Sequence, residues 1–424
     1  MKEDFLQYMW ANSLYKGDEF IAHNGKRVRI LSPGEQNRDA GPDFFNARIG
    51  VDGIVLAGNV EVHLKSSDWY RHGHHLDAAY DNVILSVVKT DDARVYNSVG
   101  REIECVVAEF ADHIYREYVF MRDCRLKPGC ARRLEQMGKE RFYLMLPSLA
   151  VERLERKVGD IRRLLLQTGN DWEECFYRLL CKYWAGNVNS AVFYQLSLNL
   201  PYKVLLKYAD RLPVVEALVF GVSGLLEEAG EDEYVKALKK EYAYYRVKHQ
   251  LVEMPGAAWR FMRIRPESFP TVRLALLAAF VCRFRTAVSR LIKAESLKEA
   301  MAFFDVRASS YWDTHYVFQK DSAQLLKRMG QTLRHSLLIN AVVPFLFLYG
   351  REKGSDRLAE KALAWLEQAA PENNYIVRTW KKCGFVFSSA LQTQALVQLK
   401  KEYCDRHLCL GCRIGREVLS LSPE

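Results

Sequence analysis

Apolar and polar side chains alternate strictly in residues 60–65, which read Val-Glu-Val-His-Leu-Lys. A period of two is typical of a β-strand that buries one face. We therefore predict a strand over 54–65, with Glu61, His63 and Lys65 on one face and the intervening apolar residues facing a hydrophobic core. The polar face is unusual for a strand flanked by apolar residues, which makes it the first candidate for a functional site.

Further elements around this strand predict an α+β domain over residues 1–120. The pair Asp52-Gly53 precedes the strand and is favoured in a two-residue hairpin turn. The expected order is a helix, three strands, a short helix and a strand, followed by one more strand. The helix is expected at 3–14 and the strands at 27–31, 44–49, 54–65, 82–88 and 101–108.

From about residue 140 the apolar period changes to 3.6 residues, which predicts a large all-α domain. We place this helical domain at 121–400 and expect the last segment, 401–424, to pack on the rest. The expected helices lie at 144–166, 172–184, 234–252, 272–284, 325–343, 356–369 and 388–403.

Composition and charge narrow the class of protein. The chain has 424 residues and a formal net charge of +9. Basic side chains in excess favour a polyanionic partner, so we expect nucleic acid, either DNA or RNA. No stretch holds the roughly 18 consecutive apolar residues of a membrane span, and the N-terminus lacks the apolar segment of a signal peptide. We therefore expect a soluble, cytoplasmic protein with no membrane partner.

A second carboxylate is expected beside Glu61. Asp43 begins the preceding strand, within residues 41–44, Gly-Pro-Asp-Phe, and a hairpin brings it back to Glu61. Two adjacent carboxylates repel unless a cation lies between them, and Mg²⁺ or Mn²⁺ prefers such oxygen ligands. A basic group beside the metal can activate an attacking water and neutralise charge on a phosphodiester. The candidate catalytic residues are therefore Asp43, Glu61, His63 and Lys65, the two carboxylates being the metal ligands.

This arrangement resembles the PD-(D/E)xK nuclease superfamily. In that superfamily an Asp, and then an acidic-x-Lys pattern on the next strand, form a metal site within a restriction-endonuclease-like α-β-β-β-α-β core. Pro42-Asp43 resembles the first half of the motif and Glu61-x-His63 the second, with His in place of Lys. Lys65 lies one strand repeat further along and could serve instead. The resemblance implies a metal-dependent nuclease, while the His leaves open an active variant, a changed substrate or a degenerate binding fold.

Three further polar residues near this motif are accessory candidates. His72 and His74 follow the strand and would lie on one side of an extended segment, where they could ligate a metal or contact phosphate. The alternative is a polar loop that closes over the site. Upstream, Glu35 lies in the turn-rich loop before Asp43, and some nucleases of the superfamily use an extra upstream carboxylate.

A cysteine cluster near the C-terminus predicts a second metal site. Cys404, Cys409 and Cys412 have the spacing Cys-x₄-Cys-x₂-Cys. The Cys-x₂-Cys part is a zinc-knuckle spacing, and the whole run matches an iron–sulfur spacing that takes its fourth Cys from elsewhere. The alternative is that reduced thiols pack the last turn. The candidates for the fourth ligand are Cys124, Cys130, Cys383 and His407.

Nearly the whole chain resembles an uncharacterised bacterial family, the domain of unknown function 2851 family. The segments that carry this resemblance are 41–44, 60–63, 67–69, 72–74, 170–173, 265–270, 344–345, 403–412 and Gly415. The family name implies no activity. Two hypotheses remain: a metal-dependent nuclease or phosphodiesterase acting on DNA or RNA, or a non-catalytic nucleic-acid-binding or scaffold protein on a degenerate nuclease fold.

Overall fold

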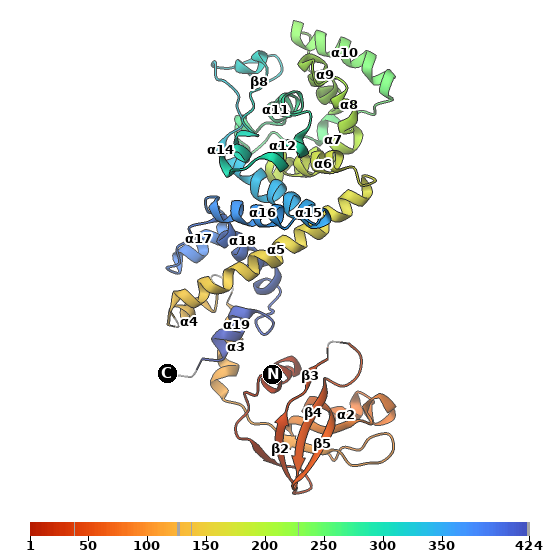
Figure 1. The fold of residues 1–424 in the computed structure, drawn as a ribbon, viewed down its shortest axis with the longest axis vertical. Coiled ribbons are helices and arrows are strands. Elements are labelled where there is room, and N and C mark those ends of the chain that lie inside the picture. The colour runs from red at the N-terminus through yellow and green to blue at the C-terminus, as the bar shows by residue number, and fades with distance from the viewer. Residues whose placement is uncertain (38, 125–127, 137, 228, 422–424) are drawn as a thin grey trace. The chain divides into compact units, whose positions relative to one another are not determined.

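The computed structural model describes residues 1–37, 39–124, 128–136, 138–227 and 229–421. The chain divides into two compact units (Figure 1). The first, here called the sheet unit, comprises Met1–Phe142 together with Lys400–Glu424. The second, the helical unit, comprises Tyr143–Leu399. A mixed α/β region followed by a helical region is thus confirmed.

The sheet unit is built on a mixed sheet with the strand order β1-β2-β4-β5-β6-β7, to which β3 is added beside β4. Strands β1 to β5 pair antiparallel, whereas β5, β6 and β7 pair parallel. An antiparallel bridge between Ala22 and Val106 brings the two edges of the sheet together. The strands are β1 Glu19–Ile21, β2 Arg27–Ser32, β3 Glu35–Gln36, β4 Phe44–Val51, β5 Ile54–Lys65, β6 Val83–Thr90 and β7 Glu104–Val107.

Strand β5 has the predicted bounds and the predicted alternation. Val60 and Val62 are fully buried in the core on one face of the sheet, together with Trp10 from helix α1 (Glu3–Ala11). The hairpin before β5 turns at Asp52 and Gly53, whose φ angles of 46° and 88° suit the expected two-residue turn.

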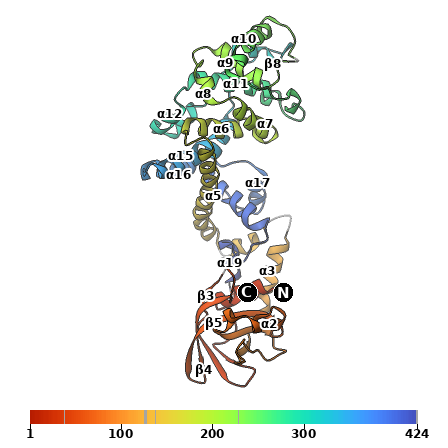
Figure 2. The same ribbon diagram turned by 90° about the vertical axis from the view of Figure 1, so that its right-hand side faces the viewer.

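The connection from β5 to β6 covers the other, polar face of β5. It contains helix α2 (Asp68–Arg71) and the short 3₁₀ turns His74–Leu76 and Ala78–Tyr80. Helix α2 packs against β5 (Figure 2). Trp69 anchors it: the indole is fully buried with Val83 and donates a hydrogen bond to the carbonyl of Tyr96. This connection, residues 66–82, is here called the crossover segment, and it is therefore fixed over Glu61 and His63.

Three more helices belong to the sheet unit, together with a π-helical turn whose first residue ends the helical unit. They are α3 Asp112–Asp123, α4 Ala131–Gln136, the π-helical turn Leu399–Cys404 and α19 Arg413–Leu419. Helix α3 packs against α19. The N- and C-terminal parts of the chain thus meet within one unit.

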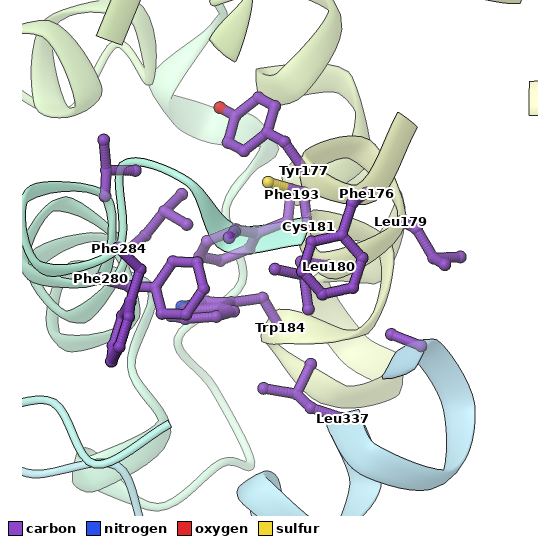
Figure 3. Close-up of a cluster of buried hydrophobic side chains, with 14 of the residues drawn as sticks. Phe176, Tyr177, Leu179, Leu180, Cys181, Trp184, Phe193, Phe280, Phe284 and Leu337 are labelled. Carbon is purple, nitrogen blue, oxygen red and sulfur yellow. The ribbon is translucent and has the colours of Figure 1, made fainter. Parts of the chain in front are cut away.

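The helical unit has one large hydrophobic core, part of which is shown in Figure 3. Trp184 is fully buried there against Phe280 and donates a hydrogen bond to the carbonyl of Arg273. Helix α5, Lys139–Gln167, begins just before the unit boundary. The other helices are α6 Trp172–Trp184, α7 Gly186–Asn199, α8 Tyr202–Leu206, α9 Leu212–Val222, α10 Glu233–His249, α11 Pro270–Arg283, α12 Ala287–Lys293, α13 Leu297–Ala302, α14 Gln331–Leu337, α15 Val343–Glu352, α16 Asp356–Gln368, α17 Tyr375–Lys382 and α18 Ala390–Gln398.

Two expectations for this unit need correction. It is not purely helical, because β8 (His315–Val317) and β9 (Lys320–Asp321) form a small hairpin. The helix expected at 325–343 begins only at Gln331, and a π-helical turn, Leu338–Val342, precedes α15. Pro344 lies in the first turn of α15 and has no N–H to donate to the preceding turn, which accounts for the widened backbone there.

Among the described residues, one helical stretch, Gln331–Glu352, is long and apolar enough to cross a membrane. A core helix passes the same test, and most of this stretch is buried within the helical unit.

Candidate functional site

Glu61 and His63 are the two buried polar side chains in the middle of β5, with 5% and 1% of their surfaces exposed. Both lie on the face opposite Val60 and Val62, as the alternation predicts. Burying a carboxylate is costly unless hydrogen bonds or a cation compensate it. The surroundings of Glu61 therefore decide what this face can do.

Two imidazoles lie close to one oxygen of Glu61, and a third lies against one of them. Oε1 lies 3.3 Å from His74 Nε2 and 3.6 Å from His63 Nε2. His63 Nε2 in turn lies 3.2 Å from His72 Nδ1. Each of the three histidines offers a ligand atom within 4.8 Å of those of the other two, so together they could hold a metal ion. We call Glu61, His63, His72 and His74 the histidine cluster.

The crossover segment brings His72 and His74 together through a turn rather than the extended chain expected from the sequence. His72 ends α2, Gly73 has a φ angle of 78°, and His74 begins the next 3₁₀ turn. A left-handed backbone at position 73 is inexpensive for Gly. Tyr80 then stacks on His74 at a centroid distance of 3.9 Å and fixes the orientation of this imidazole.

The buried imidazoles of His63 and His74 each have a ring nitrogen that makes no hydrogen bond among the described residues. Burial, and then the neighbouring imidazoles of His74 and His72, lower the pKa of His63 to about 3. His74 Nε2 is buried and makes no hydrogen bond within the described part of the chain, although it lies close to Glu61. An unsatisfied buried nitrogen is costly, and metal coordination is one way to satisfy it.

Asp43 lies beside Glu61, as the hairpin predicts. Its backbone N–H donates a 2.9 Å hydrogen bond to Glu61 Oε2, which leaves Oε1 facing the histidines. The carboxylate of Asp43 accepts hydrogen bonds from the backbone N–H of Val62 at 3.0 Å and from Gln7 Nε2 at 2.7 Å. Burial and the charge of Glu61 raise the pKa of Asp43 to about 7.

Lys65 and Glu35 are directed elsewhere. Lys65 is exposed, its ammonium group lies 3.8 Å from Asp92 Oδ2, and its backbone N–H donates to Asp68. Glu35 is exposed on β3, where its backbone pairs with that of Phe45. Of the residues proposed from sequence, the structure thus gathers Asp43, Glu61, His63, His72 and His74.

The sequence does not single out two of the residues that lie at the site. Gln7 reaches Asp43 from α1, and Tyr80 stacks on His74 from the crossover segment. Neither belongs to a motif with a chemical signature. The spacing of Gln7 between the buried Leu6 and Tyr8 was the sole hint that it lies on the core side of its helix.

The predicted cysteine ligands all belong to the sheet unit. Cys412 is buried, while Cys404 and Cys409 are half-buried. Of the candidates for a fourth ligand, Cys130 lies in the same unit and is buried, whereas Cys383 lies in the helical unit.

A comparison with protein families matches residues 3–375 to the family described as "Protein of unknown function (DUF2851)". No curated protein and no solved structure matches the chain.

Proposed function

Because the chain belongs to the DUF2851 family, whose name carries no activity, we propose a function from the geometry of the site: a metal-dependent phosphodiesterase that cleaves nucleic acid. The observation that carries this proposal is the histidine cluster, in which three imidazoles offer ligand atoms within 4.8 Å of one another and two of them face one oxygen of a buried carboxylate. A cation would satisfy the buried carboxylate and the buried imidazole nitrogens together.

The separations within the cluster suit a small metal ion. Three of them, 3.2, 3.3 and 3.6 Å, are close to the ~3.1 Å between adjacent ligands of a six-coordinate ion with bonds of about 2.2 Å, which would leave two positions for water and a phosphodiester. Of the two cations expected from the sequence, Mn²⁺ accepts imidazole more readily, because Mg²⁺ prefers oxygen ligands and water. We therefore propose Mn²⁺, and regard zinc as the competing ion to test.

Each protein group has a distinct role in this proposal. Glu61 and the three histidines hold the cation. Asp43 positions Glu61 through its N–H, and Gln7 and Val62 hold the carboxylate of Asp43 in place. When bound, the cation would polarise a phosphodiester and favour ionisation of an attacking water. His72 is the exposed member of the cluster and is the one a substrate would meet first.

Two further observations support a nucleic-acid substrate. The net charge of +9 favours a polyanion. The order of α1, the meander β2-β4-β5, α2 and the parallel strand β6 agrees with the order that the PD-(D/E)xK resemblance implies. Under this proposal Asp43 and Glu61 would correspond to the two carboxylates of that motif, and His63 would stand in place of its Lys.

A second candidate function rests on the same contacts. His63 and His74 lie within ion-pair distance of Glu61, and the contact of His74 could hold the crossover segment on a non-catalytic, nucleic-acid-binding sheet unit. The two candidates differ in whether the cluster binds a metal and whether bound nucleic acid is cut.

The deciding experiment compares wild type with Glu61→Gln. Calorimetry with Mn²⁺, and then with Zn²⁺, should show one site in wild type that Glu61→Gln weakens strongly, because the amide has no charge for the cation. Labelled single- and double-stranded DNA and RNA should be cleaved by wild type with Mn²⁺ and not by the variant.

Glu19→Gln, at an exposed carboxylate of β1, is the matched control and should behave as wild type. Nucleic-acid binding by a wild-type protein that neither binds metal nor cleaves would favour the second candidate.

A further inference from the structure

Four cysteines of the sheet unit come from two segments far apart in the sequence. Cys130 immediately precedes α4, Cys404 ends the π-helical turn, and Cys409 and Cys412 lie between that turn and α19. We propose that these four thiolates bind one thiophilic metal centre, either a zinc ion or an iron–sulfur cluster. This inference is independent of the proposed function.

The C-terminal segment is folded back on itself around the three cysteines. Leu408 N–H donates to Tyr403 O at 2.9 Å, His407 N–H to Cys404 O at 3.2 Å, and Cys412 N–H to Cys409 O at 3.3 Å. His407 has a φ angle of 55°, a left-handed conformation that reverses the chain. These bonds fold residues 404–412 into one compact loop, here called the cysteine loop.

Helix α19 packs on the cysteine loop so closely that position 415 must be Gly. A Cβ atom at Gly415 would lie 2.2 Å from the carbonyl oxygen of Cys409. The backbone of the loop is therefore held against a helix and cannot be an arbitrary surface turn.

The cysteine loop and the segment of Cys130 meet at the same place on α3. His407 Nδ1 is hydrogen-bonded to the carbonyl of Arg122 at 2.8 Å. Gly129, next to Cys130, approaches the backbone of Met121 so closely that a Cβ atom there would lie 2.6 Å from its Cα. Met121 and Arg122 are consecutive residues near the end of α3, so both segments are anchored side by side.

The electrostatics of the thiols agree with this convergence. After burial, the nearby thiols of Cys404, Cys412 and Cys409 raise the pKa of Cys130. Burial and the thiols of Cys412 and Cys409 likewise raise the pKa of Cys404 to about 12. A thiophilic cation binds the thiolate form and displaces the protons, so four neighbouring thiols are a suitable set of ligands for it.

The same contacts rank the other candidates for the fourth ligand. Cys383 belongs to the helical unit. His407 is exposed and its Nδ1 is bonded to Arg122. Cys124 is near Gly129 but follows α3 directly and is only half-buried. Cys130 is buried in the sheet unit, and its segment is anchored beside the cysteine loop at the end of α3.

The test is a metal analysis of the full chain purified without oxygen. Wild type should carry zinc, or iron with sulfide and visible absorption, and these two readouts distinguish the two centres. Cys130→Ser, Cys404→Ser, Cys409→Ser and Cys412→Ser should each lose most of the metal. Cys124→Ser and Cys383→Ser are matched controls and should keep it. Retention by Cys130→Ser, or loss by Cys124→Ser instead, would overturn the assignment.

A measurement on wild type covers the case in which the variants do not fold. A mercurial reagent binds thiolates and so releases a metal that they hold. Complete release should require four equivalents of the reagent for each metal centre, one for each cysteine ligand. Release after three would replace Cys130 by a non-sulfur ligand. A wild-type protein that holds neither zinc nor iron, even after reconstitution of the reduced protein with each, contradicts the proposal.

Discussion

At position 63, strand β5 carries a buried imidazole, and two residues further on, at position 65, it carries an exposed ammonium group. His63 is buried and lies 3.6 Å from Glu61, whereas Lys65 is exposed and pairs with Asp92. The two residues share a face of the strand, but the crossover segment covers only the first of them. The structure therefore separates two candidates that the alternation of the strand left equivalent.

We expect substitutions at these two positions to differ sharply. His63→Ala should lower Mn²⁺-dependent cleavage by about 10²-fold or more, since it removes both a ligand and a proton-transfer group. Lys65→Ala should stay within about threefold of wild type, because an exposed ion pair contributes little. Single-turnover rates at saturating Mn²⁺ measure both. A Lys65→Ala variant that binds Mn²⁺ normally but no longer cleaves would assign the basic role to Lys65 instead.

The sequence predicts those parts of the site that depend on local periodicity. Strand alternation places Glu61 and His63 together, and the Asp52-Gly53 turn returns Asp43 to them. Gln7 and Tyr80 could not be predicted, because their roles depend on how α1 and the crossover segment pack on the sheet. A loop has no regular alternation of side chains, so the sequence does not show which way its polar residues point.

At the scale of elements, the parallel pairing of β5 with β6 positions the site, and Gly58 makes it possible. A Cβ atom at Gly58 would lie 2.6 Å from the carbonyl oxygen of Asn82 and 2.5 Å from the side chain of Ile84. Backbone atoms cannot move aside without breaking the pairing that begins at Asn59 and Val83. Gly58 thus permits the close approach of the strand that carries Glu61.

Gly58→Ala should accordingly destabilise the sheet unit by about 1–3 kcal/mol, the usual range for forced overpacking. Gly50→Ala on the adjacent β4 is the matched control, because its Cβ would meet only Arg29 Cβ at 3.9 Å. Denaturant unfolding with hydrogen exchange of sheet-unit peptides measures both variants. Equal stability of the two would mean that β5 and β6 can separate without cost.

The main elements follow from periodicity, and the exceptions have local causes. Strand β5 and helix α6 begin and end as predicted. Strands β1 and β3 are too short to show any alternation. The helix expected from residue 325 begins later, because residues 325–330 are extended despite their apolar spacing. Periodicity reports burial on one side and cannot by itself distinguish a helix from an extended segment packed on a core.

At the scale of the whole molecule, each unit has a hydrophobic core of its own. The membership of the last segment in the sheet unit could not be read from sequence, because it depends on contacts between residues hundreds of positions apart, such as His407 with Arg122. Separate cores predict that each unit responds to its own buried groups.

Glu216 on α9 is such a group in the helical unit. It is 1% exposed, and burial raises its pKa to about 7 from 4.5. The folded state then binds more protons than the unfolded state between these values. Stability from this group is fully present below pH 4.5 and is lost as the pH rises through 7, by about 3 kcal/mol in total. Glu216→Gln should remove this pH dependence from the unfolding of the helical unit, while Glu241→Gln, at an exposed position of α10, should not.

We expect the stability of each unit to change independently of the other when each is perturbed through its own site. Mn²⁺ bound only by the folded histidine cluster would stabilise the sheet unit by about 2.7 kcal/mol at a hundredfold excess over its dissociation constant. Hydrogen exchange resolved by peptide should then show slower opening in β4, β5 and β6, and no change in α9 and α11.

Glu216→Gln at pH 8 should instead slow the opening of α9 and α11 and leave β4, β5 and β6 unchanged, because the charge that it removes is buried in the core of the helical unit. Glu61→Gln should abolish the Mn²⁺ effect and leave the pH dependence intact. Equal shifts of all peptides in both cases would mean that the two cores unfold as a single cooperative body.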